Sequence, residues 1–74
     1  MSGAMPLSLA SSGSVLHVES VHGNEETRRH LAALGFVEGT EFEVVSSASG
    51  NVIVSIRGSR LGLNQQSARN VYCR

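Results

Sequence analysis

The sequence predicts a mainly β protein, in which five short strands form a small, closed or nearly closed barrel. The chain has 74 residues, which is enough for one domain. Hydrophobic residues make up 41% of it, which is enough for one core. Short apolar segments, several of them alternating with polar residues, recur between glycine-containing turns. Closure of such short strands into a barrel would leave no exposed edge.

The N-terminal residues 1–12 are small, mostly polar and without period, and we expect them to form a flexible leader. The domain itself would then occupy residues 13–74. Residues 1–4 have the character of a cloning remnant, which would make Met5 the native start.

One short α-helix is expected near the N-terminus, over residues 24–34. Asn24 is a good N-cap, because its side chain can accept a free backbone N–H of the first turn. Gly35 stands where a left-handed residue should end the helix. Phe36 would then pack back on Leu31, as in a Schellman motif.

The strands are expected to place their large apolar residues on one face, as with Phe42 and Val44. Gly58 and Ser59 fit a two-residue type II′ hairpin turn, in which glycine takes the positive φ. This turn would place Arg57 directly opposite Arg60. The expected strands are residues 14–21, 40–45, 52–57, 61–63 and 70–74, with a loop over 46–51 and a helical turn over 64–69 before the last strand.

The charge pattern argues against nucleic acid as a partner, because the net charge is zero and such proteins normally carry a basic face. All six glutamates lie at or before Glu43, and four of the six arginines lie after it. These charges either mix on the barrel surface or form a bipolar surface that docks a partner. We expect no membrane insertion, because no apolar run approaches the ~20 residues that a spanning helix needs. A lone cysteine, Cys73, and no export signal are typical of a cytoplasmic protein.

Residues 28–40 (RRHLAALGFVEGT) predict a helix that ends in Leu-x-x-Leu-Gly-hydrophobic and is followed by a glycine turn and a strand. This stretch resembles the signature of the FeoA family, in which Pro-Gly usually precedes the strand. Residues 56–63 (IRGSRLGL) are similar to its β-hairpin. The resemblance covers about residues 13–73 in order and spacing. Glu38 replaces the usual proline, while Gly39 keeps the permissive backbone.

The resemblance implies an SH3-like fold, a cytoplasmic location and a partner, FeoB, the membrane transporter of ferrous iron. It therefore implies a non-enzymatic accessory module of ferrous iron uptake. The C-terminal domain of iron-dependent repressors shares the pattern, so a metal-binding or metal-sensing module is the alternative. Direction of control is left open: the module could activate, inhibit or scaffold its partner.

Catalytic motifs are missing from the sequence: it has no G-x-S-x-G, no phosphate loop and no aspartate, so we expect no enzyme. We expect no obligatory cofactor. Weak binding of Fe²⁺ or Zn²⁺ is considered because His22, Glu26 and His30 could converge at the start of the helix. Glu26 and His30 also have a structural explanation as an i,i+4 pair.

Exposed arginines are the expected partner contacts. Arg57 and Arg60 at the hairpin could grip a carboxylate patch, with Leu61 as a nearby apolar anchor. Arg28 and Arg29 on the helix form a second candidate surface. Weak self-association through edge strands is a further possibility.

Overall fold

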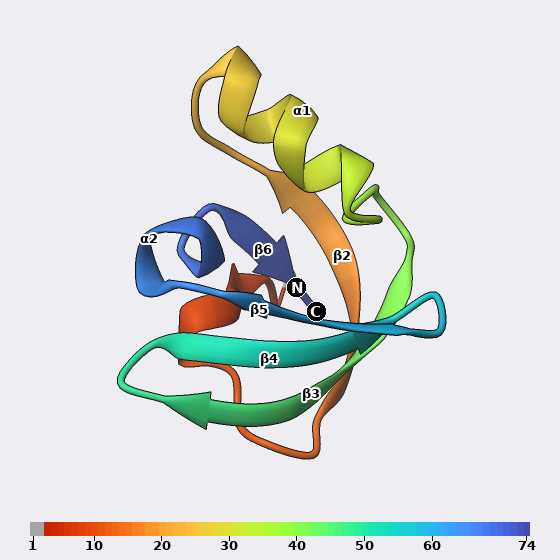
Figure 1. Ribbon diagram of the computed structural model, residues 1–74, viewed down its shortest axis with the longest axis vertical. Helices are drawn as coiled ribbons and strands as arrows, with labels where there is room; N and C mark the ends of the chain where they lie inside the picture. The colour runs from red at the N-terminus through yellow and green to blue at the C-terminus, as the bar shows by residue number, and fades with distance from the viewer. Residues whose placement is uncertain (1–2) are drawn as a thin grey trace.

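The computed structural model describes residues 3–74 as one strongly bent antiparallel sheet with two helices (Figure 1). The strand order is β1-β6-β2-β3-β4-β5, so β1 and β5 are free edges and the sheet does not close. The mainly β prediction is confirmed. The described residues form six strands where five were expected, and of the expected closed or nearly closed barrel, full closure is absent. The elements are β1 (Met5–Pro6), the 3₁₀ turn η1 (Leu7–Leu9), β2 (Val15–Val21), α1 (Glu25–Ala33), β3 (Glu41–Ala48), β4 (Asn51–Ile56), β5 (Ser59–Leu63), α2 (Gln65–Ala68) and β6 (Val71–Cys73).

Strand β2 connects the two halves of the sheet. Its first part, from Val15 to His17, pairs with β3, and its second part, from Val18 to Val21, pairs with β6. The register shifts between Val18 and Ser20, and such bulges bend a strand and increase its twist. The two halves therefore face each other across the core, as Figure 1 shows.

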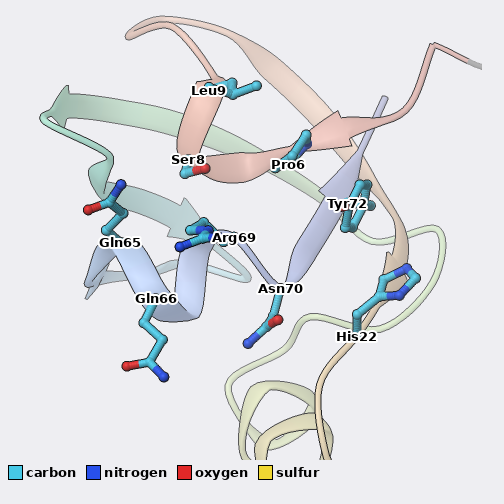
Figure 2. Close-up of a pocket in the computed structure, with 9 residues that line it drawn as sticks. All are labelled: Pro6, Ser8, Leu9, His22, Gln65, Gln66, Arg69, Asn70 and Tyr72. Carbon is cyan, nitrogen blue, oxygen red and sulfur yellow. The ribbon is translucent and has the colours of Figure 1, made fainter.

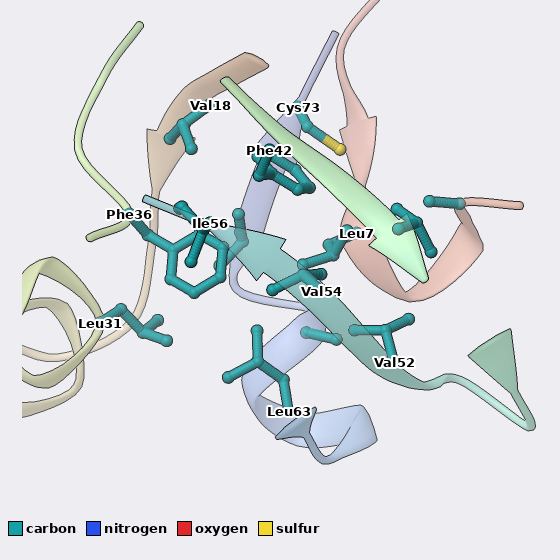
Figure 3. Close-up of a cluster of buried hydrophobic side chains, with 14 residues drawn as sticks. Leu7, Val18, Leu31, Phe36, Phe42, Val52, Val54, Ile56, Leu63 and Cys73 are labelled. Atoms are coloured by element: carbon teal, nitrogen blue, oxygen red, sulfur yellow. The ribbon is translucent and has the colours of Figure 1, made fainter. Parts of the chain in front are cut away.

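The core is apolar throughout and draws on nearly every element (Figure 3). Phe36 and Phe42 meet edge to face, with ring centroids 5.8 Å apart and an interplanar angle of 74°. Among residues 3–74, no buried polar side chain lacks a hydrogen-bond partner. The buried set is Leu7, Ala10, Val18, Leu31, Phe36, Phe42, Val44, Val52, Val54, Ile56, Leu63, Ala68, Val71 and Cys73.

Helix α1 begins and ends as its local sequence predicts. Asn24 Oδ1 accepts the backbone N–H of Thr27 at 2.8 Å, which confirms the N-cap. Gly35 has a φ of +112°. The N–H of Phe36 donates to the carbonyl of Leu31 at 3.1 Å, which is the long-range bond of a Schellman motif. The predicted cap is confirmed, and the helical turn α2 also lies where the sequence predicts it.

Residues 5–10 are part of the fold, although they were expected to belong to a flexible leader over residues 1–12. Met5 and Pro6 pair with β6 as strand β1, and Leu7 is fully buried in the core. Ala10 is also buried, so this segment covers one end of the sheet. The sequence did not indicate these elements, because a two-residue strand and one 3₁₀ turn are too short to show a hydrophobic periodicity. Residues 1 and 2 lie outside the described residues.

The β4–β5 hairpin turns one residue earlier than predicted. Its two central residues are Arg57 and Gly58, with φ of +53° and +82°, which is the type I′ requirement. Arg60 consequently pairs with Ser55, not with Arg57. Type I′ and type II′ turns both match the right-handed twist of the strands, but the observed register also keeps the like charges of Arg57 and Arg60 from lying directly opposite each other. The inward face is unchanged, because the pairing shifts by two residues.

The expected loop over residues 46–51 is mostly strand. β3 continues to Ala48, and the chain reverses in a tight turn at Ser49 and Gly50, both with positive φ. A register shift between Val44 and Ser46 ends the simple alternation that sequence reasoning relies on.

Candidate functional site: a surface for docking

Arg57 occupies the tip of the β4–β5 hairpin and is held against the end of α1. A β-carbon added to Gly35 would lie 3.1 Å from Arg57 Cδ, so the aliphatic stem of Arg57 covers this glycine. Arg60 lies further along β5 and is exposed. Leu61 is half-buried against the core, which limits it to the edge of any contact. The structure thus places the three predicted residues on one hairpin, without the expected opposition of Arg57 and Arg60.

These two arginines carry uncompensated charge. Within the described part of the chain, the side chains of Arg57 and Arg60 form no hydrogen bond or ion pair, and the same holds for the side chain of Arg69. A guanidinium without an internal partner is free to bind a carboxylate bidentately. The arrangement suits a docking contact with an acidic surface.

The second candidate surface, on α1, is engaged within its own segment. Arg28 Nη1 donates to the carbonyl of Gly23 at 2.7 Å. Arg29 Nη2 lies 2.9 Å from Glu25 Oε2, an exposed i,i+4 ion pair of the predicted kind. Both arginines are exposed but already have partners, so their guanidinium groups are less free than those of Arg57 and Arg60.

The three candidate metal ligands do not converge. His22, Glu26 and His30 are all exposed. His22 packs its ring against Tyr72 at 4.6 Å, and its Nε2 lies 3.0 Å from Ser20 Oγ. Nowhere in residues 3–74 do three or more His, Cys, Asp or Glu side chains gather as a metal site. The hypothesised cluster is wrong, and the expected pair of Glu26 with His30 does not form either.

Cys73 belongs to the core. It is fully buried, and its Sγ lies 3.4 Å from the carbonyl oxygen of Met5. Burial raises the pKa of the thiol from its usual 9.0 to about 11. A neutral, inaccessible thiol is a poor nucleophile and a poor metal ligand.

A groove of about 680 Å³, which the sequence did not indicate, lies beside α2 (Figure 2). Its walls come from three separated stretches of the chain, residues 6–9, residue 22 and residues 65–72, so no local pattern could have identified it. Tyr72 and His22 form one end, and Figure 2 shows Ser8 and Leu9 across from Gln65 and Gln66. The lining residues are Pro6, Ser8, Leu9, His22, Gln65, Gln66, Arg69, Asn70 and Tyr72.

The bent antiparallel sheet and short helices define a small SH3-like domain. The FeoA domain family matches residues 5–74, and the chain therefore belongs to the FeoA family. The match begins at Met5, the first residue of β1. Comparison with curated protein sequences gives no significant match. Among residues 3–74, no helix is long and apolar enough to cross a membrane.

Solved structures of FeoA proteins share the fold. The FeoA of Stenotrophomonas maltophilia, complexed with zinc, is 32% identical over 95% of this chain and 89% of that one, with a TM-score of 0.80. It is described as an SH3 domain protein and a candidate ferrous iron transport activating factor. An iron uptake regulatory protein (FeoA) is 27% identical over 96% of this chain and 95% of that one, with a TM-score of 0.86.

A manganese-dependent transcriptional repressor in complex with manganese also matches, with a TM-score of 0.88. It is 16% identical over 99% of this chain but only 37% of the repressor. This likeness shows that the fold recurs as one part of a longer protein.

Proposed function

We propose that this protein is a non-enzymatic accessory module of ferrous iron uptake, which docks in the cytoplasm on the cytosolic part of a FeoB-like transporter and modulates it. Membership of the FeoA family supports the link to iron uptake. The description of the related Stenotrophomonas maltophilia protein as a candidate transport activating factor points the same way.

The docking surface of this proposal is the β4–β5 hairpin. The observation that carries it is the pair of exposed arginines, Arg57 and Arg60, whose guanidinium groups have no hydrogen-bond or ion-pair partner within residues 3–74. The hairpin tip is also fixed in place, because the Arg57 stem lies on Gly35 at the end of α1. A preorganised cationic tip loses less freedom on binding than a mobile loop would. An acidic patch on the transporter is the complementary partner.

Modulation requires differential binding. A module shifts a transporter between states only by as much as it binds one state more tightly than another. We therefore expect the affinity for the transporter's cytosolic part to differ between its nucleotide-bound and nucleotide-free forms.

Two charge reversals of equal size test the surface. We expect Arg57→Glu/Arg60→Glu to weaken binding to the cytosolic domain of the transporter by at least about tenfold, since hydrogen bonds to charged groups contribute ~1.5–3 kcal/mol each. The matched control is Arg28→Glu/Arg29→Glu on α1, which should change affinity far less. Circular dichroism checks that both variants fold. Unchanged affinity in the hairpin variant would show that the surface is assigned wrongly.

The second candidate function is a metal-binding or metal-sensing module, favoured by the zinc complex of the related FeoA structure. The hypothesis for this chain is weak binding of Fe²⁺ or Zn²⁺ at exposed histidines such as His22 or His30. Anaerobic titration with either ion separates the two functions. Saturable binding, even if weak, that is lost in His22→Ala or His30→Ala would favour the metal module, and binding that neither substitution changes would favour the docking module.

A further inference from the structure

The groove beside α2 has preformed walls. Gln65 donates its backbone N–H to Asn51 Oδ1 at 2.7 Å, which ties the start of α2 to β4. Asn64 Oδ1 accepts the N–H of Ser67 at 2.8 Å, so the short helix is capped as well. On the opposite wall, η1 is fixed by the fully buried Leu7.

The end of the groove is fixed by contacts of His22. The ring of His22 packs on Tyr72 with centroids 4.6 Å apart. The backbone N–H of His22 donates to the carbonyl of Asn70 at 2.7 Å. Tyr72 thus presents a supported aromatic ring to the groove, as Figure 2 shows.

The lining combines an apolar part with a polar part. Leu9 is 70% exposed, although it is a leucine, and it shares the groove with Pro6 and Tyr72. The side-chain amides of the lining, on Gln65, Gln66 and Asn70, can each donate and accept, as a peptide backbone does.

The charge of the groove has one sign. Arg69 lines it and forms no ion pair or hydrogen bond through its side chain within the described residues. No acidic residue is part of the lining. A single free guanidinium beside apolar and amide surface complements one carboxylate next to an apolar side chain. Several cations typically hold a free phosphate, whereas Arg69 is the one arginine in the lining of this groove.

We propose that the groove binds a short extended peptide of a partner protein, with an Asp or Glu side chain on Arg69 and a neighbouring apolar side chain on Leu9 and Tyr72. The volume of about 680 Å³ lies within the ~300–1,000 Å³ of typical ligand pockets. This site goes beyond the function proposed above and shares no residue with the hairpin. Either proposal can therefore fail without the other.

Selection from a random-peptide phage library on the full chain tests this proposal. We expect the enriched peptides to carry an acidic residue beside an apolar one. A synthetic copy of the most enriched peptide should bind about tenfold more weakly to Arg69→Gln, because a charged hydrogen bond is lost. Leu9→Ala should also weaken it, whereas Arg29→Gln, which removes an exposed arginine of α1 outside the groove, should not.

Backbone amide spectra of the labelled protein then locate the bound peptide. Shifts of Leu9, Arg69 and Tyr72 are expected. The proposal is overturned if no peptide is enriched, if Arg69→Gln binds as tightly as the parent, or if the shifts lie elsewhere. Inorganic phosphate alone causing the same shifts and releasing the peptide would make this an anion site. A dimer in sedimentation that Arg69→Gln disrupts would make it a contact between copies, and both results contradict the proposal.

Discussion

Replacement of Leu7 by alanine should destabilise the protein strongly, although the sequence around it has no visible pattern. Leu7 is fully buried in the core, and truncation of such a leucine costs ~2–5 kcal/mol through lost burial and the remaining cavity. A domain of 74 residues has a free energy of unfolding of ~4–11 kcal/mol in total. Leu7→Ala should therefore remove a large part of the stability. In urea denaturation followed by circular dichroism, the midpoint should fall by at least ~1 M.

Leu9 provides the matched control within the same 3₁₀ turn. Its side chain is 70% exposed, so Leu9→Ala should change the free energy of unfolding by no more than ~0.5 kcal/mol. If the two variants unfold at the same urea concentration, residues 5–10 are not part of the cooperative fold. The reasoning from burial to stability would then be refuted for this segment.

Three further substitutions test the caps and the core cysteine. Gly35→Ala places a β-carbon on a backbone with φ of +112°, at 3.1 Å from Arg57 Cδ, so the free energy of unfolding from thermal melts should fall by ~1–3 kcal/mol. The control Gly62→Ala, whose β-carbon would have no neighbour nearer than 3.9 Å, should lose less. Asn24→Ala removes the cap on α1 and should cost ~1 kcal/mol by urea denaturation, whereas equal stability would contradict the cap. Burial raises the pKa of the Cys73 thiol from 9.0 to about 11, so between pH 9 and pH 11 the thiol ionises only in the unfolded protein. The free energy of unfolding should therefore be constant below pH 9 and fall as the pH rises towards 11, and Cys73→Ala should lack this part of the loss. An identical pH profile of the melting temperature in Cys73→Ala would contradict this prediction.

The parts of the fold that local chemistry decides could be predicted from the sequence. Asn24, Gly35 and Phe36 specify both ends of α1 within a few residues, and the hydrogen bonds follow that prediction. The inward faces of β3 and β4 could also be predicted, because alternation survives an error in the turn. Placing the hairpin one residue too late changes the register by two, which leaves every side chain on its face.

The remaining features depend on residues far apart in the chain. Met5 and Pro6 become a strand only because β6 lies beside them, and Leu7 is buried by the sheet that it covers. The groove needs residues 6–9, His22 and residues 65–72 together, so its lining gave no signal in sequence order. The exposed arginines of the hairpin were predictable, but their relative position was not, since both Arg57-Gly58 and Gly58-Ser59 are acceptable turns.

The docking account is tested most directly by titrating the isotopically labelled protein with the cytosolic domain of its FeoB-like transporter and recording backbone amide spectra. The account predicts saturable shifts that centre on residues 57–61 and on the neighbouring end of α1. Spectra unchanged at saturating transporter, or shifts confined to surfaces away from the hairpin, would contradict it.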